Sequence, residues 1–273
     1  MALRDIAVFI DSAAESDGRL RFAALLAQTH KARLTGIFVV TDSGTYRAYV
    51  RGKCAIRSMI ENWFVPEQRK VVLNGKKFTE FAARFGLLSN FRVVWSDSDR
   101  NRRIVLESLS VDLIVIGQHA PHGLPDGWHP ETLFAACSVP VLVAPAGWTG
   151  NAAAGRIAIA WNASKEARRA VSDAMPLLAS AQSVSIISVD QEDDQPGIDV
   201  ARHLSRHGVR AKVEASNSDG QTVADAILSA ATLHGADLIV IGAYGHARST
   251  RTLFGSVTHS ILLQTSIPVF MSK

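Results

Sequence analysis

The sequence repeats itself, and this repeat limits the folds that the chain can adopt. The hexapeptide Asp-Leu-Ile-Val-Ile-Gly occurs at residues 112–117 and again, letter for letter, at residues 237–242. Two further pairs of segments match in the same order: residues 138–143 with 266–271, and residues 6–11 with 157–162. Three ordered matches indicate a duplicated domain rather than a chance similarity between apolar strands.

The repeat predicts two domains, at residues 1–147 and 152–273. The small residues of segment 146–152, Ala-Gly-Trp-Thr-Gly-Asn-Ala, are typical of a linker between them. The offset between the copies is 151 at the first matched segment and 125 at the hexapeptide, so the first copy holds 26 additional residues. We expect the addition within residues 41–90, where a helix-like stretch occupies about 63–85.

Each copy alternates apolar runs with helical patterns. Runs such as Leu-Ile-Val-Ile, apolar at every position, predict strands that are covered on both faces, as in a parallel sheet between helices. In the second copy we expect strands at 156–161, 183–189, 209–215 and 237–241, and helices at about 164–181, 197–207 and 220–234. The fold class is therefore α/β, with two tandem doubly wound, Rossmann-like domains.

Charge and cysteine content exclude several classes of protein. The chain has 29 basic and 25 acidic residues, and no run of five Lys or Arg occurs, so we expect no nucleic-acid partner. Cys54 and Cys137 lie 83 residues apart, which is no metal-binding spacing and suits a reducing compartment. The apolar stretch that ends before Asp11 is too short for a signal peptide or a membrane span, so we expect a cytoplasmic protein with no membrane partner.

A glycine-containing loop follows the strand at 237–241, where doubly wound folds bind their ligands. Gly242 and Gly245 permit close approach of a ligand and positive φ. Gly255 then precedes the final helix, whose free N–H groups favour a phosphate. The hydroxyl donors Ser256 and Thr258 add to this site. His246, Arg248 and Arg251 add polar or positive character. An ordinary turn is the alternative for a single glycine, but the combination favours nucleotide binding.

The pattern Gly242-x2-Gly245-x9-Gly255-Ser256 resembles the ATP-binding signature of the universal stress protein family, and the two copies resemble its UspA-like tandem members. The resemblance covers essentially the whole chain. It implies a five-stranded parallel sheet in each domain and ATP, or another adenine nucleotide, at the strand ends. It places Ala160, Trp161, Asn162 and Val189 around base and ribose. It places Gly242, Gly245, Gly255, Ser256, Val257 and Thr258 around the phosphates, with Ile241, His246 and Arg248 nearby.

The sequence departs from the family at the end of the first strand of the second copy. Asn162 stands where an aspartate is common, and an amide balances the charge of Mg²⁺ poorly, so we expect any Mg²⁺ to be held mainly by the phosphates. Trp161 either stacks on the base or belongs to the core.

The first copy lacks the signature. Ala120 replaces the second glycine and Trp128 stands opposite Ser256, so we expect a degenerate domain that binds no nucleotide, although it keeps Asp11. Side chains that bind metals gather in its loop, at His119, His122, Asp126, His129 and Glu131, but their spacing matches no zinc pattern and we expect no metal site.

The leading functional hypothesis is a stress-response or signalling protein in which ATP, bound in the second domain alone, sets conformation or choice of an unknown protein partner. The alternatives are a weak ATPase or phosphotransfer enzyme, which lacks an evident catalytic base, and a scaffold that needs no nucleotide. The resemblance also implies that the last strands of the two domains pair as an intramolecular pseudo-dimer. The alternative is a homodimer.

Replacing Gly245 by Val should lower ATP affinity far more than stability. A Cβ at this position blocks the approach of phosphate to backbone N–H groups, and each charge-assisted hydrogen bond lost costs about 1.5–3 kcal/mol. A positive φ would cost a non-glycine residue about 1–2 kcal/mol. Calorimetric titration with ATP and thermal unfolding of the ligand-free variant check this. Unchanged ATP affinity would mean that the loop is an ordinary turn.

Overall fold

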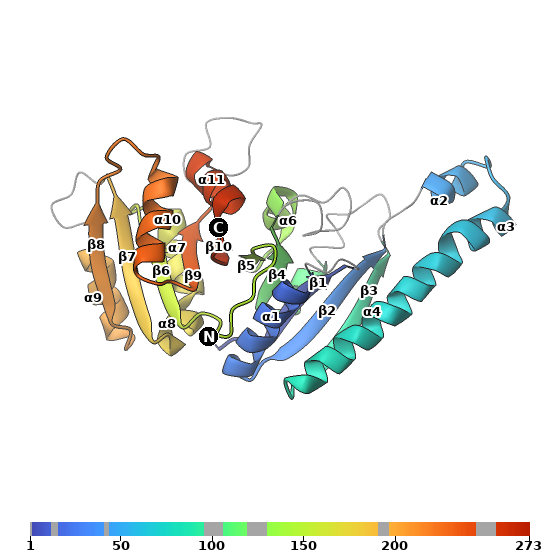
Figure 1. The fold of residues 1–273 in the computed structure, drawn as a ribbon, viewed down its shortest axis with the longest axis horizontal. Helices are drawn as coiled ribbons and strands as arrows, with labels where there is room; N and C mark the ends of the chain where they lie inside the picture. Colours follow the sequence, from blue (N-terminus) through green and yellow to red (C-terminus); the bar gives the residue numbers. More distant parts are fainter. Residues whose placement is uncertain are drawn as a thin grey trace.

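Ten strands form a single sheet in the computed structural model, which describes residues 2–11, 16–40, 44–95, 106–118, 130–190, 197–243 and 255–273 (Figure 1). The strands of the first domain are β1 (Asp5–Ile10), β2 (Arg33–Val40), β3 (Ser89–Trp95), β4 (Leu113–Gly117) and β5 (Val141–Ala144). Those of the second are β6 (Arg156–Ala160), β7 (Ser183–Val189), β8 (Ala211–Ser216), β9 (Leu238–Gly242) and β10 (Val269–Ser272). The strand order is β3-β2-β1-β4-β5-β10-β9-β6-β7-β8.

Each domain contributes five parallel strands in the same order, which confirms the predicted doubly wound fold. The helices of the first domain are α1 (Ser16–His30), α2 (Gly44–Val50), α3 (Ile56–Met59), the π-helical turn η1 (Ile60–Phe64), α4 (Val65–Arg84) and α6 (Pro130–Ala136). Those of the second are α7 (Lys165–Asp173), α8 (Met175–Ser180), α9 (Ile198–Arg206), α10 (Val223–Leu233) and α11 (Ser256–Gln264). None of the described helices has both the length and the apolar character that a membrane span requires.

The apolar strands bury both of their faces, as their sequences predict. Along β1, Ile6 and Val8 belong to one hydrophobic cluster, whereas Ala7 and Phe9 belong to another. The first cluster packs beneath α1, α4, α7 and α9, and the second beneath α6, α10 and α11. Because successive strand residues point to opposite faces, a run that is apolar at every position requires helices on both sides of the sheet.

The two domains meet where β5 and β10 pair antiparallel, with Leu142 opposite Phe270. Each domain also supports a helix end of the other. Gln118 Nε2, just after β4, donates to the carbonyl oxygen of Leu262 at 2.7 Å, near the end of α11. Lys273 Nζ, just after β10, donates to the carbonyl oxygens of Phe134 at 3.1 Å and Ala135 at 2.5 Å, in the last turn of α6. These donors satisfy carbonyl groups that a helix end leaves without partners.

The expected linker packs against α1. The Trp148 indole meets the ring of Phe22 edge-on, with ring centroids 5.0 Å apart. Gly18 is required beneath it, because a Cβ there would lie 2.6 Å from the Trp148 carbonyl oxygen. Arg21 Nη2 donates to Asn151 Oδ1 at 2.5 Å. The segment is therefore tied to the first domain.

Two details differ from the sequence-based expectation. The helix expected at 164–181 is divided into α7 and α8, because Pro176 lies in the first turn of a new helix and lacks the N–H group that a continuous helix needs. The helical stretch expected at 63–85 is present, but it begins with the π-helical turn η1 before α4. As expected, the additional residues of the first copy lie between β2 and β3.

Replacing Gln118 by Ala should lower the free energy of unfolding by about 1–2 kcal/mol, because carbonyl groups at the end of α11 lose their donor. Urea denaturation measures the change. Gln28→Ala is the control, since Gln28 makes one exposed hydrogen bond, to the Phe85 carbonyl oxygen within the first domain, and should cost less than about 0.5 kcal/mol. Equal losses would contradict a special role for Gln118.

Candidate functional site

A cavity of about 350 Å³ opens at the carboxyl ends of β6, β7 and β9. Its described lining includes Ala160, Trp161, Asn162, Val189, Ile241, Gly242, Gly255, Ser256, Val257 and Thr258. All of these residues were candidates from the sequence, and the structure brings them together around one space. The other candidates, Gly245, His246 and Arg248, lie outside the described residues.

The lining also contains residues that sequence reasoning missed: Ser164, Ile187, Asp190, Val223 and Ile227. The periodicity of strands and helices could have identified three of them from the sequence. Ile187 is two residues before Val189 in β7 and therefore faces the same side of the sheet. Val223 and Ile227 are four residues apart on α10 and share a helix face. Asp190 had no such signal, since its position depends on how the chain leaves β7.

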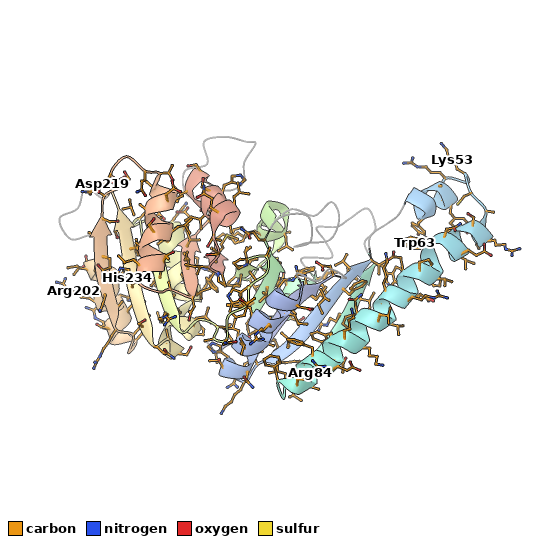
Figure 2. All side chains as sticks on the ribbon, viewed as in Figure 1. Lys53, Trp63, Arg84, Arg202, Asp219 and His234 are labelled. Atoms are coloured by element: carbon orange, nitrogen blue, oxygen red, sulfur yellow. The ribbon has the colours of Figure 1, made fainter. Side chains whose placement is uncertain are left out.

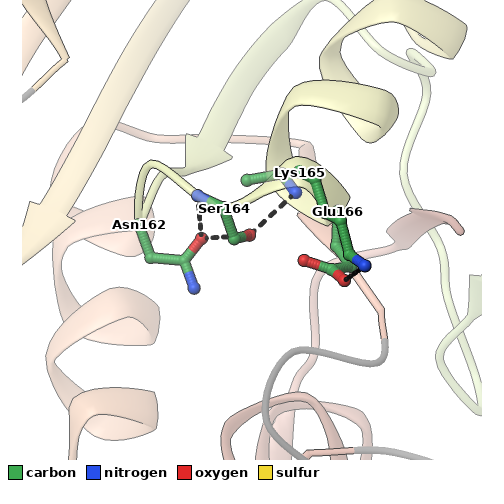
Figure 3. A network of polar contacts seen from close by, with 5 residues as sticks. Asn162, Ser164, Lys165 and Glu166 are labelled. Atoms are coloured by element: carbon green, nitrogen blue, oxygen red, sulfur yellow. Dashed lines mark hydrogen bonds and ion pairs between the residues drawn. The ribbon is translucent and has the colours of Figure 1, made fainter.

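Asn162 is held by the start of α7 (Figure 3). Its Oδ1 atom accepts hydrogen bonds from the Ser164 hydroxyl at 2.7 Å and from the Ser164 N–H at 3.3 Å. The Ser164 Oγ atom in turn accepts from the Ala167 N–H at 3.1 Å and caps α7. Oδ1 is occupied in this way, and the amide N–H donors of Asn162 have no partner among the described residues, so they can serve a ligand.

Gly242 has a packing role that the sequence did not reveal. A Cβ at this position would collide with the backbone of Glu166 and Ala167, and would lie 2.8 Å from the Glu166 carbonyl oxygen. The sequence permits positive φ at Gly242, but the φ of Gly242 lies outside the left-handed region. Glycine at 242 instead allows the first turn of α7 to approach β9, and this close approach forms one wall of the cavity.

The helices that begin at the cavity are not equivalent. Ser164 caps α7 and Thr222 caps α10, and each helix has an acidic residue in its first turn, Glu166 and Asp225. In contrast, α11 begins after Gly255 with no side-chain cap and no acidic residue in its first turn. No described residue accepts a hydrogen bond from its first N–H groups outside the helix, so these groups and the positive end of the helix dipole are available to an anion.

A negative charge lies at the opposite end of the cavity, after β7. Asp190 Oδ1 accepts a hydrogen bond from the Ser218 N–H at 2.9 Å, and this bond lowers the pKa of the carboxyl group. Asp190 is exposed and has φ +50°, a conformation that its short side chain tolerates. The cavity thus has a carboxylate at its β7 end and the uncapped α11 at its β9 end.

Trp161 contributes to the core and also lines the cavity, while its stacking on a base stays a prediction. Its side chain lines the cavity and also packs against the hydrophobic cluster that contains Ile159. Its N–H donates to the Ile187 carbonyl oxygen at 2.8 Å, which continues the pairing of β6 with β7 beyond Ala160. Thr258 is more buried than expected for a phosphate ligand. Its hydroxyl makes a long contact of 3.5 Å with the Gly242 carbonyl oxygen and links α11 to β9.

In the first domain the equivalent strand end is differently arranged. Asp11 Oδ2 pairs with Arg19 Nη2 at 2.9 Å, and Arg19 is buried within α1. The offset of 151 residues places Asn162 opposite Asp11 and Ala170 opposite Arg19. Six loop residues of the first copy that the sequence analysis named lie outside the described residues: His119, Ala120, His122, Asp126, Trp128 and His129. The side chain of Glu131 is likewise outside the description.

The described residues contain no group of three or more side chains placed to hold a metal ion. Cys137, which follows α6, is buried, and burial raises the pKa of its thiol to about 12, although the nearby Lys273 ammonium acts in the opposite direction. The thiol therefore stays protonated at neutral pH, and it is a poor metal ligand in that form.

Comparisons with known proteins identify relatives. Residues 154–273 match the universal stress protein family. A universal stress protein from Archaeoglobus fulgidus superposes with a TM-score of 0.68 at 18% identity, over 98% of this chain and 96% of that one. A Pseudomonas aeruginosa protein of unknown function gives a TM-score of 0.61 at 17% identity, over 99% of this chain and 92% of that one. A putative universal stress protein from Pseudomonas aeruginosa gives a TM-score of 0.56 at 17% identity, over 99% of this chain and 93% of that one. A search of curated proteins gave no significant match.

Replacing Gly242 by Ala should lower the free energy of unfolding by about 1–3 kcal/mol, because the added Cβ must displace the backbone of α7. Gly155→Ala is the matched control, since its Cβ would meet a side-chain atom, the Asp237 carboxylate oxygen at 3.2 Å, rather than backbone. Urea denaturation of both variants measures the difference. A loss at Gly242 no larger than that at Gly155 would show that α7 does not depend on this approach.

Proposed function

We propose that this chain, whose residues 154–273 match the universal stress protein family, binds an adenine nucleotide, ATP, in the cavity of its second domain. The observation that carries the proposal is the uncapped N-terminus of α11, which opens on this cavity without an acidic residue in its first turn. A helix start with these properties is a suitable anion site. Bound nucleotide would set the conformation or partner choice of a stress-response protein.

The charge distribution of the cavity orients the nucleotide. The phosphates belong at the β9 end, where Gly255, Ser256 and Val257 present the start of α11. The base and ribose belong over β6 and β7, against Trp161 and the apolar residues Val189, Ile187 and Ile227. Asp190 is an acceptor for ribose hydroxyls at this end, and the same carboxylate would repel a phosphate. The reverse orientation would place the phosphates beside Asp190.

The residues present fit ATP better than they fit a protein-held metal ion. Among the described lining residues Asp190 is the one carboxylate, and its Oδ1 atom is occupied by the Ser218 N–H. Asn162 supplies an amide whose oxygen is occupied by Ser164. Mg²⁺ would therefore enter with the nucleotide and be held mainly by the phosphates, where it neutralises part of their charge.

We further propose one nucleotide site per chain. In the first domain the carboxylate of Asp11 is committed to Arg19, and the sequence places Trp128 where the second domain has Ser256. The two domains, at residues 1–147 and 152–273, then act as an intramolecular pseudo-dimer with one binding and one non-binding member. The pairing of β5 with β10 supports this arrangement.

Isothermal titration of the full chain with ATP should give one site per chain. Replacing Ser256 by Trp should lower ATP affinity at least about tenfold, because the indole occupies the phosphate end and removes charge-assisted hydrogen bonds. Leu263→Trp is the control on the same helix, since Leu263 is exposed and does not line the cavity. The control should bind ATP like the parent chain.

Other outcomes would favour the alternative functions. Two equivalent ATP sites would contradict the single site, and no binding would favour a scaffold that needs no nucleotide. Equal affinities of the Ser256→Trp and Leu263→Trp variants would exclude α11 as the phosphate site. Steady phosphate release by the parent chain, lost in Ser256→Trp, would instead indicate an ATPase.

A further inference from the structure

The segment between β2 and β3 forms a projection that the second domain lacks. We call residues 44–84, which comprise α2, α3, η1 and α4, the arm. Figure 1 shows the arm extending from the edge of the sheet, with α2 and α3 farthest from the body. In Figure 2 its length is marked by Lys53 at the far end and Arg84 near the body. The second domain joins β7 to β8 through the shorter segment 190–210.

Aromatic packing fixes the arm where it leaves the sheet. The Trp63 ring in η1 lies 4.8 Å from the Tyr46 ring and 5.8 Å from the Trp95 ring, measured between centroids. Phe64 stacks on Trp95 at 6.2 Å. Nearer the body, Phe78 of α4 is buried against the first domain. The arm is therefore held in one direction, and its far end is presented to solvent.

Beyond this aromatic cluster, apolar side chains are exposed. Val50 is 64% exposed, Ile56 56% and Ile60 40%, and α3 contains no buried residue. Clustered exposure of this kind on a projecting element indicates a contact surface, whereas isolated exposed apolar residues are ordinary. Because α2 and α3 lie at the end of the projection (Figure 1), a partner can reach this contact surface without meeting the body of the protein.

The arm also carries the positive charge of the protein. It contains nine basic and three acidic residues, a net charge of +6, whereas the rest of the chain has 20 basic and 22 acidic residues, a net charge of −2. The three acidic residues pair with basic residues of the arm itself: Glu61 with Arg57, Glu67 with Lys70, and Glu80 with Lys76. The remaining six basic residues are in excess, among them Arg51 and Lys53 beside the exposed Val50.

From these observations we propose that the arm docks on an anionic lipid surface. Val50, Ile56 and Ile60 would enter the boundary between headgroups and acyl chains, while Arg51 and Lys53 contact the headgroup phosphates. Exposed apolar side chains flanked by basic ones on a projecting helical element are suited to this kind of contact, because the bilayer surface offers apolar chains beneath anionic headgroups. The sequence-based expectation of no membrane partner rests on the lack of an apolar stretch long enough to span a membrane, and a contact with the bilayer surface needs no such stretch.

Two other occupants fit less well. A second copy of the chain would bring another arm of the same charge against this one, and like charges repel. Nucleic acid offers phosphates but no apolar surface for Ile56 and Ile60, and Trp63 is too deeply packed to stack on a base. An anionic bilayer offers both negatively charged headgroups for the basic residues and apolar acyl chains for Ile56 and Ile60.

Sedimentation of the full chain with vesicles tests the proposal. We expect the protein to bind vesicles of phosphatidylcholine and phosphatidylglycerol in equal parts, and to bind vesicles of phosphatidylcholine alone much more weakly. High salt should weaken the binding, because it screens the headgroup charge. Absence of binding to the mixed vesicles, or equal binding to both kinds, would overturn the proposal.

Variants locate the contact. Arg51→Glu with Lys53→Glu, and separately Ile56→Ser with Ile60→Ser, should each weaken binding to the mixed vesicles at least about tenfold. The matched controls are Arg210→Glu with Lys212→Glu beside β8, and Leu233→Ser, which changes an apolar side chain that is 84% exposed. The controls should bind within about twofold of the parent chain. All changed side chains are exposed, and circular dichroism verifies folding.

The proposal fails if the arm and control variants bind equally. It also fails if sedimentation equilibrium without lipid shows a dimer that the arm variants dissociate, because the arm would then be an interface between copies. ATP affinity, measured on the same variants, should equal that of the parent chain. This independence separates the lipid proposal from the proposed nucleotide site.

Discussion

The antiparallel pairing of β5 with β10 is the interaction on which the arrangement of the chain depends. Val141, Leu142 and Val143 lie opposite Met271, Phe270 and Val269, and all of these residues are buried. In a separate domain each of these strands would be an apolar edge with unpaired backbone groups, which invites association. Pairing them within one chain completes the backbone hydrogen bonds of both edges and joins two five-stranded sheets into one.

The two copies have diverged at positions that interact. Asp11 and the buried Arg19 form an ion pair in the first domain, and the equivalent positions hold Asn162 and Ala170 in the second. Removing one partner of a buried ion pair leaves a costly unpaired charge, so the two positions are expected to change together. In the second domain the amide oxygen is satisfied locally by Ser164, and no cation is needed behind it.

Much of the fold could be predicted because its signals are local. The duplicated hexapeptide and the apolar runs identified the strands, and the glycine pattern, with the family resemblance that it carries, identified most of the described cavity lining. Contacts between distant segments could not be predicted in this way. The collision that excludes a Cβ at Gly242 involves Glu166 and Ala167, more than seventy residues earlier in the chain. Asp190 and the projecting direction of the arm likewise depend on tertiary packing, which no short-range pattern encodes.

The helix α11 connects the cavity of the second domain with the first domain. Its first turn lines the cavity, and near its last turn the Leu262 carbonyl oxygen accepts a hydrogen bond from Gln118 of the first domain. A helix is stiff along its axis, so a displacement of one end must appear at the other. If α11 shifted to meet a ligand, it would strain or break the bond to Gln118. Because one end of α11 lies at the cavity and the other is bonded to the first domain, a movement of the helix at the cavity would be transmitted to the contact between the domains.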